Sequence, residues 1–244
     1  IVFFVFSVFC QQLAAQNVIT IKDNFDEINL ANKVQYYSDS LNETNFQNIS
    51  KYNTFIDSKS SFLNFKITKA TVWLKFKIQN LSDYRRIKLC IDQLNINDIE
   101  LFQDDSTALS KVDDTHGTDF KIINDYHKVP SFVFDLNVTK GETKTFYLKV
   151  NNKGQLFIPL YLRNTNKLND VWLKKFVIFG IYAGIILALL FYNLFLAVSI
   201  KDDRKSYVWY LFHSVFILLT QASFQGFTTL FLWPYNHFMA NQGI

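Results

Sequence analysis

Two long uncharged runs, separated by five consecutive charged residues, constrain the fold of this chain more than any other feature. Residues 176–200 carry no charged side chain, the stretch KDDRK follows at 201–205, and a second uncharged run begins at 207. As a helix, the first run would span about 37 Å, which exceeds the roughly 30 Å hydrocarbon core of a bilayer. The sequence therefore predicts transmembrane helices over 176–200 and 207–230, joined by a loop over 201–206.

Residues 17–170 carry nearly all the charge and show the alternation of a β domain. In TVWLKFKI at 71–78 every second residue is apolar, which predicts a strand with one buried and one solvated face. Similar runs follow, separated by turn signals such as NLSDY at 80–84 and TKGET at 139–143. The predicted fold class is mainly β: a jelly-roll-like β-sandwich over 51–165, followed by a connector over 166–175 and the transmembrane α-helical hairpin.

The segments before the sandwich indicate export. Residues 1–15 hold an apolar core of about nine residues followed by Ala14 and Ala15, the pattern of a signal peptide. The chain has no initiator Met and no basic start, so we expect it to begin inside a longer reading frame. A lead-in is expected over 16–50, and the stretch 23–62, rich in Asn, Ser and Asp, predicts a short helix and an early strand.

Export of the β domain fixes the direction of the first helix, which must run from outside to inside. This places KDDRK in the cytoplasm and makes 231–244 the start of an extracytoplasmic loop. Three basic residues in the inner loop, against Lys174 and Lys175 outside, agree with that orientation. The connector also holds Trp172, which we expect at the lipid–water boundary, where amphipathic rings settle.

Four aromatic residues fall on the face of the strands opposite to the core set: Trp73, Tyr147, Phe157 and Tyr161. Exposed aromatic rings stack well on sugars, so these residues are the candidate site for a carbohydrate or small-molecule ligand. Two alternatives stay open. A loop, the lead-in or the membrane region could cover the rings, or the rings could contact a second copy or another periplasmic protein.

Other classes of site lack support in the sequence. A net charge of +4, spread along the chain, argues against a nucleic-acid partner. No hydrolase, metalloprotease or nucleotide-binding motif occurs, so we expect no catalytic residue and no enzyme activity. Cys90, alone once the signal peptide is removed, should be a buried apolar side chain. His116 and His127 fit no metal-ligand spacing, so no metal site and no cofactor are expected.

The first apolar run has features of a helix that packs against other helices. Gly180, Gly184 and Ala188 are four residues apart, a spacing that lets a neighbouring helix approach closely, and Asn193 is a polar group at membrane depth. The second run holds further polar residues, which two helices cannot all shield from lipid. We therefore expect the hairpin to belong to a larger bundle.

These residues resemble a known family. The stretches GIYAGIILALLFYNLFL at 180–196, SYVWY at 206–210 and GFTTLFLWP at 226–234 are similar to the start of the bacterial seven-transmembrane receptors with diverse intracellular signalling modules (7TMR-DISM). The soluble part resembles their second type of extracellular domain in VWLKFKIQNLS at 72–82, DIELF at 98–102 and FYLKV through IPLYL at 146–162.

The resemblance implies a sensor in the bacterial inner membrane, multi-pass, with a periplasmic N-terminal domain. It implies a carbohydrate-module-like sandwich that binds sugars or related ligands. It also implies a cytoplasmic output beyond residue 244, such as a histidine kinase, a cyclic-di-GMP enzyme or a DNA-binding regulator. The family supplies no ligand residues for transfer to this chain, and a periplasmic protein–protein interaction module remains the alternative function.

Overall fold

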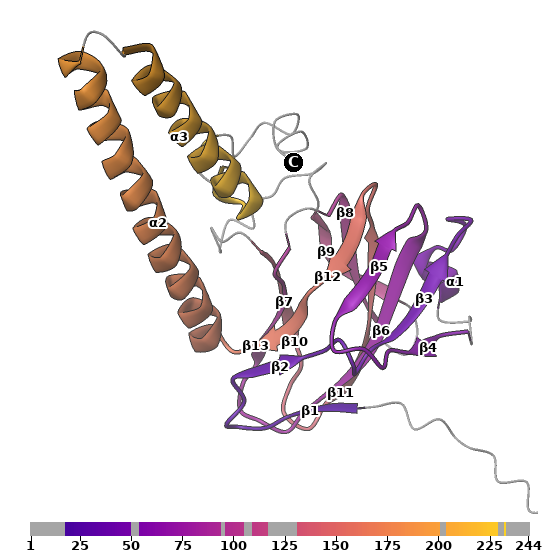
Figure 1. Ribbon diagram of the computed structural model, residues 1–244. Coiled ribbons are helices and arrows are strands. Elements are labelled where there is room, and N and C mark those ends of the chain that lie inside the picture. Colours follow the sequence, from indigo (N-terminus) through magenta and orange to yellow (C-terminus); the bar gives the residue numbers. More distant parts are fainter. Residues whose placement is uncertain are drawn as a thin grey trace, which may run out of the picture.

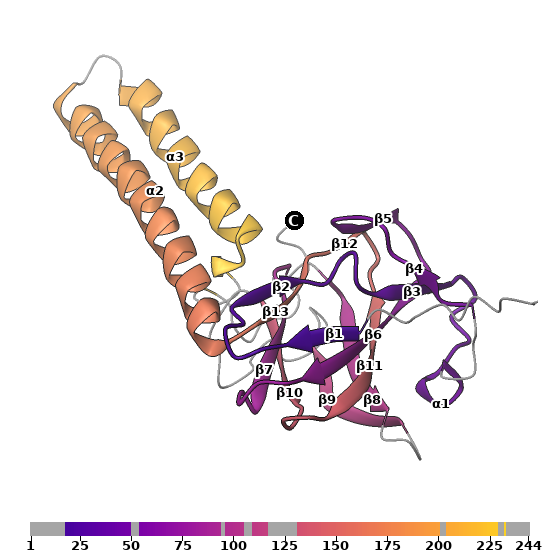
Figure 2. The same cartoon turned by 90° about the horizontal axis from the view of Figure 1, so that it is seen from below.

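A computed structural model of the chain describes residues 18–49, 54–93, 96–104, 109–116, 131–200, 204–228 and 232. It consists of a β domain followed by a hairpin of two long helices, which projects from one side of the domain (Figures 1 and 2). The mainly β class, with a β-sandwich followed by a helical hairpin, is thus confirmed. The bounds of the first elements are β1 Val18–Ile21, β2 Glu27–Asn29, β3 Gln35–Asp39, α1 Phe46–Ile49, β4 Ile56–Asp57, β5 Leu63–Ile67, β6 Thr71–Asn80 and β7 Arg86–Ile91.

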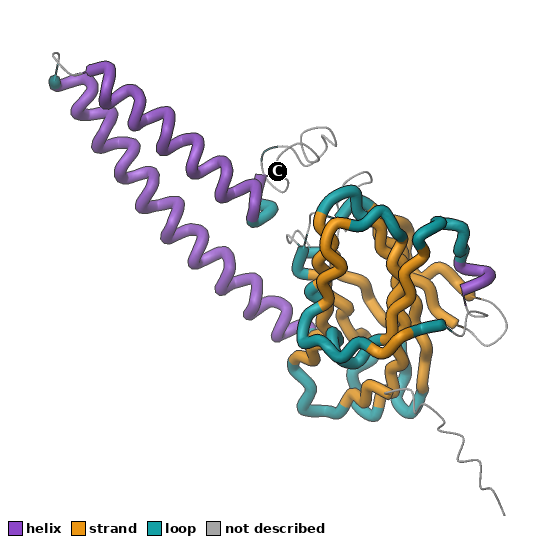
Figure 3. Tube along the Cα trace, turned by 45° about the vertical axis from the view of Figure 1, so that its right-hand side comes forward, coloured by secondary structure: helices purple, strands orange, loops and turns teal. Residues whose placement is uncertain are grey.

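The remaining strands follow in the chain and lead into the two helices. Their bounds are β8 Asp98–Asp104, β9 Leu109–His116, β10 Phe132–Asn137, β11 Thr143–Asn151, β12 Gln155–Ile158, β13 Leu160–Arg163, α2 Thr165–Ser199 and α3 Arg204–Phe224. Figure 3 shows the strands gathered in one body and the two helices projecting from it.

A seven-stranded sheet forms one layer of the β domain. Its order is β4-β3-β6-β11-β8-β9, and β1 pairs in parallel with the second half of β6. The long strands β6 and β11 form its centre, with Phe146 opposite Phe76. Those two rings stack at 5.7 Å between centroids on the inner face. The alternation predicted for 71–78 therefore sets the register of the central strand pair.

A four-stranded sheet, in the order β10-β7-β13-β2, forms the second layer, and β5 pairs with β12 in a separate two-stranded sheet. The inward residues of all three sheets build one apolar core. The alternating residues of β6 are its clearest members, with exposed fractions of 1% or less: Val72, Leu74, Phe76 and Ile78.

The lead-in contributes more regular structure than the sequence indicated. Three strands lie within it: β1 and β3 join the seven-stranded sheet, and β2 lies at the edge of the four-stranded sheet. The short helix α1 was expected, but only one early strand was. These strands are three to five residues long and largely polar or part-exposed, so they give no strong alternation.

Helix α2 begins much earlier than the first uncharged run. It is a single 35-residue helix, and the side chain of Asn164 caps it by accepting a hydrogen bond from the backbone N–H of Lys167 at 2.7 Å. The predicted connector is therefore the first part of α2. Both α2 and the Lys205–Phe224 part of α3 are long and apolar enough to cross a membrane, and the rest of the chain buries little of either.

Helix α3 also differs from the predicted span. It begins at Arg204, before the expected 207, and ends at Phe224 rather than 230. Gly226 follows with a φ of +77°, a conformation that glycine adopts at helix ends. The turn brings Phe227 back onto α2, where its ring stacks on that of Phe179 at 4.1 Å.

Candidate functional site

Two of the four predicted ligand-binding aromatics lie on the outer face of the seven-stranded sheet, as their parity predicted, but they are buried. Trp73 is 0% and Tyr147 2% exposed. They form a small cluster with Phe102 and Ile49, against which Tyr37 and Phe55 also pack. Ile49 and Phe55 come from α1 and the segment before β4. Cover by another segment, one of the alternatives that the sequence left open, is the arrangement observed for these two rings.

Lysine side chains border this covered cluster. The Lys75 ammonium lies 5.5 Å from the Phe55 ring centre and 5.7 Å from that of Tyr147. Burial lowers the pKa of Lys75, against a raising effect of Asp104, and burial raises the pKa of Tyr147 to about 12. Among the described residues, the indole N–H of Trp73 has no hydrogen-bond partner. A ligand could reach Trp73 or Tyr147 only if the covering segment moved.

The other two predicted aromatics lie elsewhere, so the four residues do not form one site. Phe157, on β12, lies opposite Asn64 of β5 and is half-buried. Tyr161, on β13, lies on the outer face of the four-stranded sheet, where it packs at the start of α2. The alternation correctly predicted that each of these side chains lies on the face of its strand opposite to the core. It could not show that the strands belong to different sheets. Their role in ligand binding stays a prediction.

A buried ion network lies where the β domain meets α2. Arg163, the last residue of β13, has a side chain only 4% exposed. Its guanidinium donates to both carboxylate oxygens of Asp92 at 2.9 Å and, through Nε, to Glu27 at 2.6 Å. The same guanidinium lies 4.5 Å above the Tyr161 ring. One side chain thus ties β13 to β2 and to the segment after β7.

Helix α2 takes part in this ion network directly. The Lys175 ammonium is 3.9 Å from Asp92, and the Ser131 hydroxyl donates to the same carboxylate at 2.7 Å. Burial acts to raise the pKa of Asp92, but the hydrogen bonds and charge of Arg163, helped by Lys175 and Ser131, outweigh it and lower that pKa. Two carboxylates face two cations, so the network is formally neutral.

Asn164 anchors the first turn of α2 to the lead-in. Its side-chain amide donates to the backbone carbonyl of Phe25 at 2.6 Å and to the Asp26 carboxylate at 3.0 Å, while its oxygen caps the helix. Neither Asn164 nor Arg163 was singled out from the sequence. The sequence offered one signal for Arg163: the alternation places it on the outer face of its strand, next to the predicted connector. Its partners Asp92 and Glu27 lie 71 and 136 residues away in the sequence.

Apolar contacts complete the junction. Leu168 and Trp172, one helical turn apart on α2, are 1% and 4% exposed and pack against Cys90 and Val133. The Trp172 ring thus packs on the outer surface of the four-stranded sheet, and its place at the lipid–water boundary stays a prediction. Cys90 is buried, as predicted, and burial raises its thiol pKa to about 12.

The predicted helix-packing residues lie on surfaces that α3 does not occupy. Gly180, Gly184 and Ala188 are exposed, and a Cβ added to either glycine would meet nothing within 4 Å. Asn193 donates to the carbonyl of Leu189 within its own helix at 2.9 Å. The segment after α3 instead contacts α2 through Phe227, whose ring meets those of Phe176 and Phe179. The small-residue stripe thus remains a prediction for another helix.

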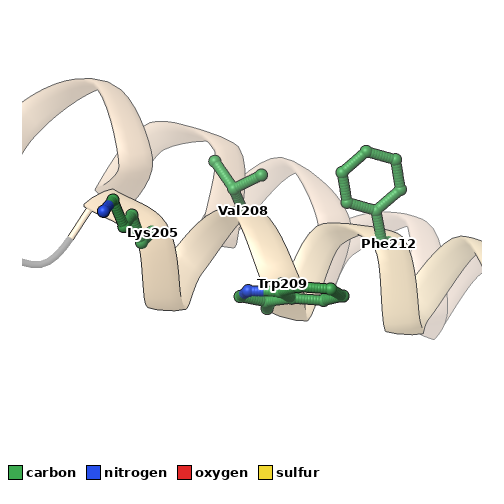
Figure 4. Close-up of a pocket in the computed structure, with 4 residues that line it drawn as sticks. All are labelled: Lys205, Val208, Trp209 and Phe212. Atoms are coloured by element: carbon green, nitrogen blue, oxygen red, sulfur yellow. The ribbon is translucent and has the colours of Figure 1, made fainter.

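An apolar hollow occurs on the outer side of α3, near its start. Figure 4 shows its lining residues, Lys205, Val208, Trp209 and Phe212, all on one helix. Trp209 is 74% exposed, so this is an open helix face rather than an enclosed site. Within the described ranges, no group of three or more His, Cys, Asp or Glu residues could hold a metal ion.

Comparison with known proteins assigns a family to each part of the chain. A family model described as "7TMR-DISM extracellular 2" matches residues 31–164, more than half of the chain. A second, described as "7TM diverse intracellular signalling", matches residues 175–244. The boundary between the two matches falls within the first part of α2. No curated protein matches the chain significantly.

Among solved structures, an isomalto-dextranase from Arthrobacter globiformis T6, complexed with panose, aligns at 11% sequence identity and a TM-score of 0.24. The alignment covers 53% of this chain and 23% of that one. The aligned part thus spans less than a quarter of the length of that enzyme. A likeness at this TM-score carries no argument about fold or ligand.

Proposed function

We propose that this chain, which belongs to the seven-transmembrane receptors with diverse intracellular signalling (7TMR-DISM), senses an extracytoplasmic ligand with its β domain and transmits the signal through α2. It is a membrane receptor with its N-terminal domain outside and with membrane-spanning helices. The proposal adds the ligand, the route of the signal, a multi-pass location in a bacterial inner membrane and an intracellular output module. It assigns no catalytic step to this chain.

One observation carries the route of the signal: α2 is one continuous helix from the β domain into the membrane segment. Its first turn is held by Asn164, and its third turn by Trp172 and Lys175. A helix transmits a displacement more directly than a flexible linker, because its residues keep a fixed rise and rotation. Ligand binding that shifts the domain would therefore move α2.

Such a shift needs two states of the junction that a ligand distinguishes. The ion network around Arg163 joins Glu27 of β2, Asp92 after β7 and α2 itself, three segments that are distant in sequence. A ligand that changed the spacing of these segments would alter the geometry of all the bonds at once. We therefore place the coupling of the two parts at this network.

For the ligand, a carbohydrate or related small molecule remains the proposal. Of the four predicted aromatics, Phe157 and Tyr161 have part-exposed rings, which could stack on a sugar without prior movement. Trp73 and Tyr147 would become available only in a second state with the covering segment displaced. The proposal therefore assigns initial contact to the part-exposed rings.

A glycan-binding experiment tests this assignment. The full chain, reconstituted in nanodiscs, is titrated with a panel of oligosaccharides, alongside Phe157→Ala and Tyr161→Ala. We expect at least one glycan to bind and one of the variants to weaken that binding about tenfold, with an unchanged melting temperature. Tyr84→Ala, at an exposed tyrosine 37% accessible, is the matched control.

Trp73→Ala is a poor probe, because removing a fully buried tryptophan costs about 3–5 kcal/mol of stability. Absence of glycan binding throughout the panel, together with dimerisation that Phe157→Ala or Tyr161→Ala disrupts, would contradict the sugar assignment. That outcome would favour the alternative, an extracytoplasmic module that contacts a second copy or another protein.

A further inference from the structure

Three turns meet at one end of the β domain. The strand registers place them together: Asp39 of β3 lies opposite Thr71 of β6, and Ile67 of β5 lies opposite Gln155 of β12. The hairpin between β11 and β12 belongs to the same end, because Val150 lies opposite Val72. We call these segments the tip turns: residues 40–44, 66–70 and 151–154.

Hydrogen bonds fix the tip turns to one another. Asn42, which has a φ of 55°, accepts from the N–H and hydroxyl of Thr71 at 2.9 and 2.7 Å and donates to the carbonyl of Lys69 at 3.3 Å. Asn151 donates to the same Thr71 hydroxyl at 3.3 Å. The buried Asp39 carboxylate closes its turn by accepting from the Thr44 N–H at 2.7 Å. The tip turns thus form one rigid unit.

The outer side of this unit is apolar and basic. Ile67 and Leu41 are 80% and 75% exposed, the highest values among the large hydrophobic side chains of the described residues. Exposed basic and acidic side chains of the tip turns are Lys66, Lys69, Lys153 and Glu43. Single exposed apolar residues are ordinary, but two of them among lysines are the composition of a membrane-surface contact.

The position of α2 places this end of the domain toward the membrane. Lys175, on the last charged turn before the uncharged run, is 3.9 Å from Asp92, whose backbone N–H donates to the Pro159 carbonyl at 3.1 Å. Pro159 therefore lies close to the Lys175 side chain, where the charged part of α2 ends. From Pro159, β13 leads to Asn164, where α2 begins, whereas β12 leads the other way, to Gln155 and the tip turns.

Of the two ends of this stretch, Asn164 begins the docked part of α2, and the tip turns lie at the other end. Strand β12 extends about 13 Å from Pro159 to Gln155 at the rise of an extended chain. In Figure 1 the end of the domain at which β12 begins points toward the side to which the helical hairpin rises.

We infer that the tip turns rest on the headgroup layer of the same bilayer that α2 crosses. Leu41 and Ile67 enter the interfacial region, and Lys66, Lys69 and Lys153 contact anionic lipid phosphates. The bilayer is thus a second support for the β domain, separate from the α2 junction. This inference goes beyond ligand sensing, and it does not depend on which ligand binds.

A fluorescence-quenching experiment tests the contact in the full chain. A bimane label is attached to Ile67→Cys or Leu41→Cys in a Cys10→Ser background. Cys90 stays unlabelled because it is fully buried. The proteins are placed in nanodiscs of phosphatidylethanolamine and phosphatidylglycerol, with or without lipid that carries a nitroxide on its headgroup. We expect both labels to lose most of their fluorescence with the nitroxide lipid.

The matched control is Leu81→Cys, a 43% exposed leucine just past the other end of β6, which should keep its fluorescence. Reversal of three charges, by Lys66→Glu, Lys69→Glu and Lys153→Glu together, should restore the fluorescence of the label at 67. Quenching at 41 and 67 no stronger than at 81 would overturn the inference. Cover of the tip turns by another protein segment would give this result, because it leaves both labels unquenched.

Discussion

Arg163 lies in the β domain at its junction with α2. Its buried guanidinium binds carboxylates from two distant segments, and its Asp92 partner also faces Lys175 of α2. A buried charge is costly unless it is paired and hydrogen-bonded, and here each charge has an opposite neighbour. Removal of one member therefore leaves the others exposed to the full cost of burial.

We predict that Arg163→Met lowers the stability of the β domain by about 3–5 kcal/mol, because Asp92 loses the partner that compensates its burial. For a chain of this size the melting temperature should fall by roughly 6–20 °C, measured by far-ultraviolet circular dichroism of the detergent-solubilised chain. Arg163→Met combined with Asp92→Leu should recover part of the loss. Equal melting temperatures for the single variant and the parent would contradict this reading.

The same network predicts a pH dependence. The pKa of Asp92 is lowered in the folded state, so its pairing stabilises the fold above the unfolded value of about 3.9 and is lost as the pH falls through the folded value. The stability difference between the parent and Arg163→Met should therefore be large at pH 7 and shrink below about pH 4. Melting temperatures across this range measure it, and a constant difference would exclude Asp92 as the cause.

At the scale of elements, α2 serves both as a docking helix and as a membrane span. Its 35 residues extend about 52 Å, more than one bilayer core requires, so its first three turns remain available for the β domain. Leu168 and Trp172 occupy one face of those turns. This buried apolar face, rather than the polar residues of the segment, packs the connector onto the β domain.

We predict that Leu168→Ala combined with Trp172→Ala releases the start of α2 from the four-stranded sheet, since two buried side chains lose their contacts. Hydrogen–deuterium exchange of the full chain in nanodiscs should then become faster in residues 165–175 and in β7. Asn169→Ala, at an exposed position of the same helix, is the control and should leave exchange unchanged. Unchanged exchange in the double variant would show that Asn164 and Arg163 suffice for docking.

The sequence predicted some elements well because their signal is local. Strict alternation in 71–78 and 146–150 marked the central strands, and the absence of charge over 176–200 marked the membrane part of α2. Cover over Trp73 was one of the alternatives left open, but the sequence could not identify the covering residues, because Ile49 and Phe55 reach that face only through the paths of α1 and β4. The Arg163 network was also missed, since its partners lie far away in sequence.

For the whole molecule, orientation relative to the membrane is the property on which the other proposals rest. The extracellular family match covers the β domain, so the domain lies outside and α2 must enter the membrane with Lys175 on the outer side. In the proposed multi-pass topology, the turn between α2 and α3 belongs to the cytoplasmic side. Lipid contact of the tip turns and transmission through α2 both require this arrangement.

Cysteine labelling tests that orientation directly. In a Cys10→Ser background, Tyr84→Cys in the β domain should react with a membrane-impermeant maleimide in intact spheroplasts, whereas Asp203→Cys should react only after permeabilisation. Cys90 provides the internal background, because its burial raises the thiol pKa to about 12 and little thiolate is present near neutral pH. Labelling of Asp203→Cys in intact spheroplasts would reverse the topology, and the lipid contact of the tip turns would then have to be sought on the cytoplasmic leaflet.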